Sequence, residues 1–105
     1  MRESDLKKQI LQGLQYRGIY CWVNQTVGVW NKKTQGYYKS GKKGVGDILG
    51  LLPKTGQFLC IEVKVKPNVQ TIEQKYFEED IKKNNGVYIL AYNWETVDEF
   101  LLSVK

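Results

Sequence analysis

The stretch Asp47-Ile-Leu-Gly-Leu-Leu-Pro-Lys-Thr-Gly-Gln-Phe-Leu-Cys-Ile-Glu-Val-Lys-Val-Lys66 determines how this chain folds. Its two β-rich runs, residues 47–52 and 58–65, flank a Pro-Lys-Thr-Gly-Gln segment that is a strong turn signal. The pattern predicts an antiparallel β-hairpin. Side chains alternate between the two faces of a strand. One face of the second strand therefore carries Leu59, Ile61, Val63 and Val65, and the other carries Phe58, Cys60, Glu62, Lys64 and Lys66.

The length of the turn decides which residues face each other across this hairpin. A four-residue loop, 53–56, would put Asp47 directly opposite Glu62, whereas a two-residue turn at 55–56 would put it opposite Lys64. Both registers leave the three side chains on one face, and only a loop of odd length would separate them. Two carboxylates that face each other across a strand pair destabilise a sheet. A bound divalent cation would reverse that effect, and carboxylates with carbonyls and waters suit Mg²⁺ or Mn²⁺.

Outward from the hairpin, apolar periodicity and cap residues predict helices on both sides of it, together with further strands. The predicted helices cover 3–16, 71–84 and the residues after Asn93, and the predicted strands cover 19–23, 27–30 and 87–92. We expect 27–30 to be the hairpin partner of 19–23, and 87–92 to be covered on both faces because it is almost wholly apolar. The glycine-rich segment 31–46 is interpreted as a loop. The result is a single domain, 1–105, in the order α-β-β-β-β-α-β-α.

Length and composition limit the classes of function. The chain has 105 residues, of which 42% are hydrophobic, and no histidine. The absence of histidine excludes Ser-His-Asp and Cys-His catalysis and histidine-based metal sites. Cys21 and Cys60 are far apart and lie in apolar stretches, so we expect two buried thiols in a reducing compartment. Because the N-terminus lacks the apolar core of a signal peptide and no apolar run could span a membrane, we expect a soluble, cytoplasmic protein.

The positive charge is concentrated in the first half of the chain. The formal net charge is +5, with nine Lys or Arg against two acids in residues 1–45 and seven Lys against nine acids in residues 46–105. The densest basic stretch, 31–43, is interleaved with or flanked by aromatic residues, namely Trp22, Trp30, Tyr37 and Tyr38. Lysines attract phosphates and aromatic rings stack on bases, so the stretch is typical of nucleic-acid binding. A solvated loop that keeps the protein soluble has the same composition.

The lysines and glycines that precede Asp47, and the lysine that follows Lys64, indicate where phosphates would approach. Lys39, Lys42 and Lys43 precede the segment Gly44-Val-Gly46, in which the backbone carries no bulky side chain next to Asp47. We expect Gly44 and Gly46 to admit a phosphate backbone, although a flexible entry to a strand would look the same. Lys66 shares the face of Lys64 and is a further candidate phosphate contact.

The segments Gly44-Val-Gly-Asp47 and Ile61-Glu-Val-Lys64, followed by Gln74 on the next helix, resemble the PD-(D/E)XK nuclease superfamily. Within it the chain is most similar to the VRR-NUC family in its small stand-alone phage form. The resemblance covers nearly the whole chain, from about residue 3 to residue 92, and departs from the family in having Gly46 in place of the motif proline. It implies an α/β restriction-endonuclease-like fold, in which a central mixed β-sheet is flanked by helices.

The resemblance also implies the role of each site residue. Asp47 and Glu62 would be metal ligands, together with the main-chain carbonyl of Val63, and the metal would be Mg²⁺ or Mn²⁺. Lys64 would orient or help deprotonate the attacking water. The metal would lower the pKa of its water and polarise the scissile phosphate.

Two more residues are candidates on the basis of their helix positions. Gln74 shares a helix face with Phe77 and Ile81, so its side chain points toward the sheet and could reach Lys64, unless it only forms a capping box with Thr71. Glu3 lies on the apolar stripe of the first helix, where the family places a glutamate near the metals. A favourable interaction with the helix dipole, or a frayed terminus, would equally explain an acid there.

The sequence therefore predicts a metal-dependent, structure-selective DNA endonuclease that resolves branched DNA such as Holliday junctions in a bacterial or phage-infected cell. The preference for branches rests on the resemblance alone. A homodimer is expected, because a junction presents two equivalent strands and one domain has one site. A flap or single-strand nuclease, or nickase, and a non-catalytic DNA-binding module are the alternatives.

Overall fold

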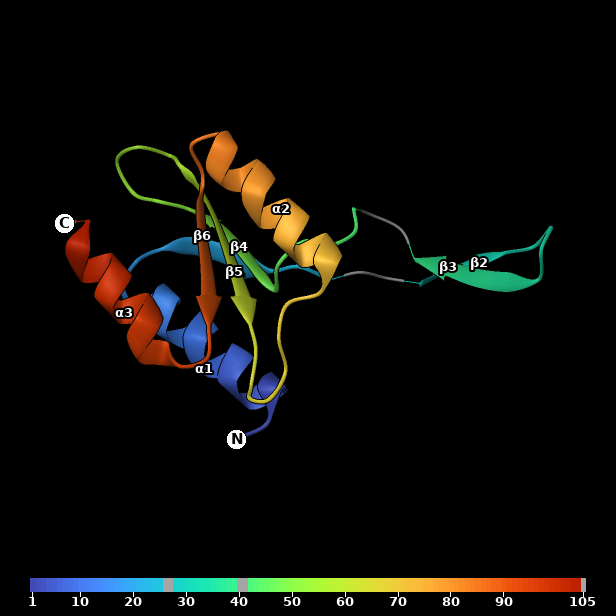
Figure 1. Ribbon diagram of the computed structural model, residues 1–105, viewed down its shortest axis with the longest axis horizontal. Helices are drawn as coiled ribbons and strands as arrows, with labels where there is room; N and C mark the ends of the chain where they lie inside the picture. The colour runs from blue at the N-terminus through green and yellow to red at the C-terminus, as the bar shows by residue number, and fades with distance from the viewer. Residues whose placement is uncertain (26–27, 40–41, 105) are drawn as a thin grey trace.

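A computed structural model describes residues 1–25, 28–39 and 42–104, and for 28–31 and 37–39 it describes the backbone only. Helices flank a four-stranded mixed sheet in an α/β arrangement, and a separate two-stranded hairpin lies at one end of the long axis (Figure 1). The elements are α1 (Glu3–Tyr16), β1 (Tyr20–Val23), β2 (Gly28–Asn31), β3 (Gly36–Lys39), β4 (Ile48–Leu51), β5 (Phe58–Val63), α2 (Ile72–Lys83), β6 (Val87–Ala91) and α3 (Trp94–Ser103).

The central hairpin has the first of the two registers that the sequence allowed. Ile48 pairs with Ile61 and Leu51 pairs with Phe58 in the antiparallel β4–β5 ladder. The N–H of Leu52 donates to the carbonyl of Gln57 at 2.9 Å, which closes the four-residue loop 53–56. The even loop length places Ile48 of β4 and Ile61 of β5 on the same face, in the main core.

The pairing of β1 differs from the sequence prediction. The sheet order is β1-β4-β5-β6, with β1 antiparallel to β4 and β6 parallel to β5. The expected hairpin of 19–23 with 27–30 is therefore wrong. Pairing with β4 instead lets Cys21 of β1, and Ile19 just before it, pack against the main core, which a hairpin with β2 alone would not provide.

The second difference is a strand inside the segment interpreted as a loop. β2 pairs with β3, with Val29 opposite Tyr38 and Trp30 opposite Tyr37. The aromatic and β-branched residues favour strand pairing, and Gln35 takes a positive φ of 53° in the connecting turn. The loop prediction for 31–46 is thus wrong at Asn31 and over 36–39, because the glycines of a short hairpin resemble those of a loop.

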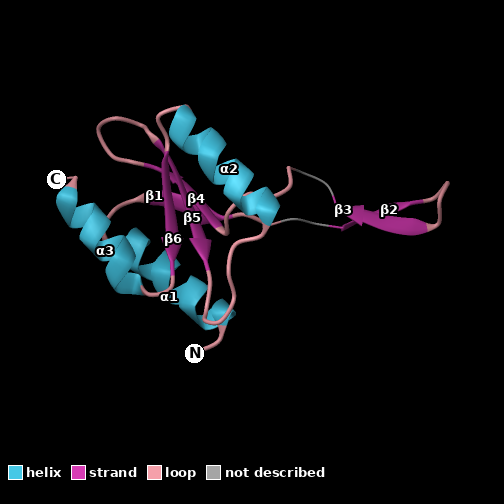
Figure 2. Cartoon of the chain, in the orientation of Figure 1, coloured by secondary structure: helices cyan, strands magenta, loops and turns pink. Residues whose placement is uncertain are grey.

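Helices cover both faces of the sheet (Figure 2). On one face α1 and α3 bury the main core through residues such as Ile10, Leu14 and Val97, which pack with Leu59 and Ile61 of β5. On the other face α2 contributes Phe77, which packs with Cys60 and Tyr88. The prediction that the last strand is covered on both faces is confirmed, because β6 contributes residues to both clusters. Among the described residues no helix is long and apolar enough to cross a membrane.

Candidate active site

The candidate site lies where β4 begins and β5 ends. The N–H of Asp47 donates to the carbonyl of Ile61 at 2.9 Å, so the ladder is not continued straight across to Glu62. Instead, Oδ2 of Asp47 accepts from the N–H of Val63 at 2.8 Å. The Asp47 carboxylate therefore accepts the hydrogen bond that a main-chain carbonyl would accept in a regular ladder. Asp47 does not pair directly with Glu62, as the four-residue loop had predicted, because its N–H bonds to Ile61 instead.

Glu62 is a carboxylate buried inside the sheet, with 3% of its surface exposed. Its Oε1 accepts from Nε2 of Gln74 at 2.8 Å and lies 3.5 Å from Nζ of Lys64. Its Oε2 is buried and has no hydrogen-bond partner among the residues that the structure describes. A buried polar atom without a partner costs free energy, so this oxygen needs a proton, a cation or a water as its partner.

The environment of Glu62 favours its neutral form. The pKa of its carboxyl is raised to about 7, first by burial and then by the charge of Asp47, while the charge of Lys64 and its hydrogen bond lower it. The charge of Glu3 adds a smaller raising effect. Asp47 thus raises the pKa of Glu62 in the direction expected for two carboxylates that repel each other.

Gln74 takes both of the roles that the sequence left open, with a different partner in the site. Its Oε1 accepts from the N–H of Thr71 at 2.8 Å, and its own N–H donates to Oγ1 of Thr71 at 3.2 Å, which is a complete capping box. The opposite end of the same amide donates to Glu62 rather than to Lys64. The N-terminus of α2 is thereby linked to the buried carboxylate.

Lys7 is a site residue that the sequence reasoning missed. Its Nζ lies 3.3 Å from Oδ1 of Asp47, and both side chains are partly buried. Lys7 lies one helical turn after Glu3, which is half-buried at the start of α1. The i, i+4 spacing of the two was a signal in the sequence, because it places both side chains on the helix side that faces the core.

The glycines next to Asp47 have packing reasons of their own. A Cβ on Gly44, whose φ is +80°, would lie 2.3 Å from the carbonyl oxygen of Glu73 at the start of α2. A Cβ on Gly46 would lie 2.4 Å from Sγ of Cys60. Both positions therefore require glycine, because the chain leading into β4 lies against α2 and Cys60. The expected contact of these glycines with a phosphate backbone stays a prediction.

The structure describes the side chains of three of the four lysines predicted to contact phosphates. Lys42 and Lys43 are exposed directly before the glycines, and Lys66 is exposed in the loop after β5. Lys39 ends β3, but its side chain lies outside the described part of the structure, as do those of Trp30, Tyr37 and Tyr38.

The donor atoms are compatible with a hard divalent cation. No group of three or more His, Cys, Asp or Glu side chains suited to a metal is found within residues 1–25, 28–39 and 42–104. Mg²⁺ is commonly bound through only one or two carboxylates, with the remaining ligands supplied by waters and substrate phosphate. Asp47 and the unpartnered Oε2 of Glu62 fit that pattern, and the main-chain carbonyl of Val63 stays a predicted third ligand.

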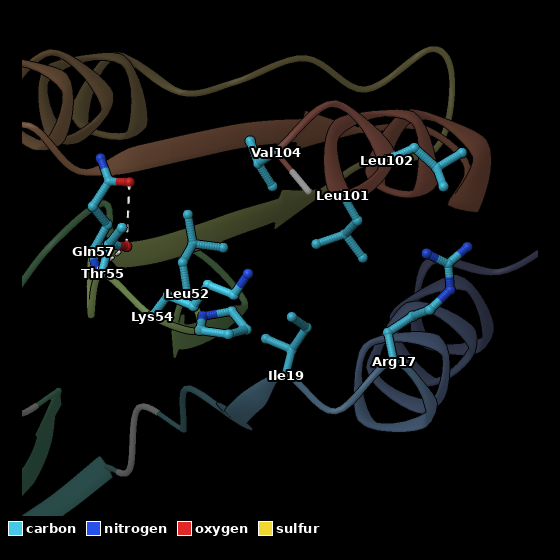
Figure 3. A pocket seen from close by; sticks show the side chains of 10 residues that line it. Arg17, Ile19, Leu52, Lys54, Thr55, Gln57, Leu101, Leu102 and Val104 are labelled. Atoms are coloured by element: carbon cyan, nitrogen blue, oxygen red, sulfur yellow. Dashed lines mark hydrogen bonds between the residues drawn. The ribbon is translucent and has the colours of Figure 1, made fainter.

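A separate cavity of about 460 Å³ lies at the opposite end of the strands (Figure 3). Mainly apolar side chains from the ends of α1 and α3 and from the β4–β5 turn line it, including Ile19, Leu52 and Leu101. Since β4 and β5 run their full length between this cavity and Asp47, it does not belong to the candidate site.

Comparison with known proteins leaves the family open. No family model matches the chain, and neither a curated protein nor a solved structure is significantly similar to it.

Proposed function

We propose that this chain is a divalent-metal-dependent DNA endonuclease of the VRR-NUC family, with a restriction-endonuclease-like fold, that cleaves branched DNA. The observation that carries the proposal is the buried Glu62 carboxylate, whose Oε2 lacks a partner in the described structure while Asp47 repels its charge. A strand that merely faced solvent would have no reason to bury this acid.

The arrangement of cations around the carboxylates supports a site rather than a structural ion pair. Lys64 is 3.5 Å from Oε1 of Glu62, whereas the buried Oε2 has no partner among the described residues. A purely structural pair is stabilising only when its remaining polar atoms are satisfied, and here one is not. A non-catalytic DNA-binding module would gain nothing from two carboxylates beside phosphates.

Each residue has a distinct task in the proposed reaction. Asp47, Glu62 and the Val63 carbonyl would hold Mg²⁺ or Mn²⁺, which supplies Lewis-acid polarisation of the phosphate and a water of lowered pKa. Gln74 holds the Glu62 carboxylate in place through its 2.8 Å hydrogen bond. Lys64 would orient the attacking water and offset the negative charge that develops on the phosphate.

The deciding experiment is a cleavage assay on four labelled DNAs of equal length: a four-way junction, a flap, a single strand and a linear duplex. Each is incubated with wild type, Asp47→Asn or Glu62→Gln, with Mg²⁺ or with chelator. Glu79→Gln is a matched control, because Glu79 is an exposed acid on α2. We expect metal-dependent cleavage that falls by orders of magnitude in both site variants and is retained in the control.

The choice of DNA separates the alternatives. Preferential cleavage of the junction supports resolution of branched DNA, and preferential cleavage of the flap or the single strand supports the other nucleases considered above. Binding without cleavage at any metal concentration would identify a binding module. Near wild-type cleavage by Glu62→Gln would show that the site is elsewhere.

A further inference from the structure

Two large aromatic side chains stand exposed on β1, at the edge of the sheet. Tyr20 is 71% exposed and Trp22 is 42% exposed, although both belong to a regular strand. Their ring centroids are 5.6 Å apart and their planes are inclined at 59°. We call these two residues the aromatic shelf.

The shelf lies on the same sheet face as the buried carboxylate. Tyr20 pairs with Leu51 and Trp22 with Leu49, and Leu49 in turn pairs with Cys60 of β5. Because side chains alternate along each strand, this face also carries Glu62. Phe77 of α2 covers Cys60 on this face. In the described part of the chain Tyr20 and Trp22 of β1 remain exposed there, and Leu51 beside them is 39% exposed.

The shelf ends next to the candidate site. Asn24 follows β1 by one residue, and its N–H donates to the carbonyl of Asp47 at 2.8 Å. Trp22 is two residues before Asn24, which is roughly 7 Å along an extended strand. A strand of DNA whose phosphate enters the site would therefore carry its neighbouring bases across the shelf.

The charge around the shelf fits a polyanion. No acidic residue occurs in 15–25 or in 48–61, the segments that form β1, β4, β5 up to Glu62 and the turn between them. The charged residues of these segments are Arg17, which is ion-paired with Asp98, and Lys54, which is exposed in the turn beyond Leu51. An exposed apolar surface without acids next to a phosphate-cleaving site matches the chemistry of single-stranded DNA, in which aromatic rings stack on bases near basic groups.

We propose that the aromatic shelf binds unpaired bases of the DNA strand whose phosphodiester enters the Asp47–Glu62 site. The preferred substrate then contains unpaired nucleotides beside the cut, as at a fork or an opened branch point. This inference rests on the proposed nuclease function and adds that the protein recognises unpaired bases beside the cut.

The test measures binding in chelator, so that cleavage plays no part. The probes are fluorescently labelled oligothymidine, a forked DNA with unpaired arms and a fully paired duplex of the same length. The proteins are wild type, Trp22→Leu, Tyr20→Leu and Trp22→Phe, which keeps an aromatic ring. Tyr16→Leu is the matched control, because Tyr16 is an exposed aromatic at the end of α1 that is not on the sheet.

We expect Trp22→Leu to weaken binding to oligothymidine and to the fork by about 5- to 150-fold, which is the loss of one base–aromatic stack. Duplex binding should change by less than about twofold, Trp22→Phe should recover part of the loss, and Tyr16→Leu should match wild type. The salt dependence of binding should keep its slope, because no phosphate contact is removed.

Other results would overturn the proposal. Equal losses on the duplex and the single strand, or no loss on either, would mean that no base stacks on the shelf. A shift in oligomeric state by sedimentation, with unchanged DNA affinity, would assign the shelf to contact with a second copy. If Trp22→Leu does not fold by its melting curve, Tyr20→Leu and Trp22→Phe decide between the same outcomes.

The two proposals fail separately. Shelf-dependent binding of unpaired DNA without any metal-dependent cleavage would remove the nuclease function and keep the shelf. Cleavage that depends on Asp47 but is indifferent to Trp22 and Tyr20 on every DNA would remove the shelf and keep the nuclease.

Discussion

At the scale of single residues, Glu62 makes the stability of the metal-free protein depend on pH. The folded pKa of about 7 lies above the ordinary value of 4.5, so between these values the folded state holds a proton that the unfolded state has lost. This contribution is fully present below about pH 4.5 and is lost as pH rises through about 7. It amounts to on the order of 3 kcal/mol.

We therefore expect the melting temperature in chelator to fall between pH 5 and pH 8 by on the order of 10 °C more in wild type than in Glu62→Gln. Melting curves at four pH values for both proteins test this. Parallel pH dependences in the two proteins would mean that Glu62 titrates normally, and the account of the buried carboxylate would be wrong.

Lys7 gives a second prediction at the residue scale. Its ammonium balances Asp47 in the metal-free protein, and a divalent cation at Asp47 would be repelled by it. Lys7→Met should lower the metal-free stability by up to about 1 kcal/mol and tighten Mg²⁺ binding by about fivefold. Titration calorimetry with Mg²⁺ measures the second effect, and Lys8→Met is the control because Lys8 is exposed. Weaker Mg²⁺ binding in Lys7→Met would contradict this role.

At the scale of elements, the N-terminus of α2 stabilises both the helix and the site through one amide. Gln74→Glu keeps a side chain that can complete a capping box with Thr71, but it replaces the donor to Glu62 with a like charge. Gln74→Ala loses both interactions.

Gln74→Glu should therefore cleave at least about tenfold more slowly. Gln74→Ala should additionally lose the cap, which is worth about 0.5–2 kcal/mol of stability. Cleavage rates over a range of Mg²⁺ concentrations, with melting curves of both variants above pH 7, separate the two roles. Full activity in Gln74→Glu would leave Gln74 as a helix cap only.

The segment that leads into β4 gives a prediction about DNA affinity. Lys42 and Lys43 are exposed just before the glycines that bring the chain to Asp47. Replacing both with Ala should weaken DNA binding and reduce its salt slope by up to about two units, if each lysine pairs with a phosphate. The double variant of Lys82 and Lys83, at the far end of α2, removes the same charge and should bind like wild type. Identical slopes in the two variants would assign Lys42 and Lys43 to solubility.

At the scale of the whole molecule, each chain offers one pair of hairpin carboxylates, whereas a junction presents two equivalent strands. We expect a homodimer related by a two-fold axis, at least on DNA. Sedimentation of the free protein at micromolar concentration and of its complex with junction DNA measures this. A monomer under both conditions would contradict the prediction, and paired cuts would then need another explanation.

Features that depend on neighbours in the sequence were predictable from the residues alone. The alternation 58–63 and the Pro-Lys-Thr-Gly-Gln turn signal predicted the β4–β5 hairpin, because strand period and turn residues are local properties, and left two registers open. The spacing of Leu6, Ile10 and Leu14 predicted α1, and Thr71 with Gln74 predicted the start of α2. Each of these rests on hydrogen bonds or side-chain faces within one element or one turn.

Only the tertiary structure decided how these elements meet. The partner of β1 depends on burying its apolar side chains against a core assembled from distant segments, so a local hairpin with β2 could not compete. The spacing of Glu3 and Lys7 indicates only the side of α1 on which Lys7 lies. Its contact with Asp47 joins α1 to the entry of β4 across a long stretch of intervening sequence, and this partner is set by the tertiary structure. The burial of Glu62, which moves its pKa, likewise requires α2 to lie over the sheet, because desolvation is a property of the packed molecule and not of the strand.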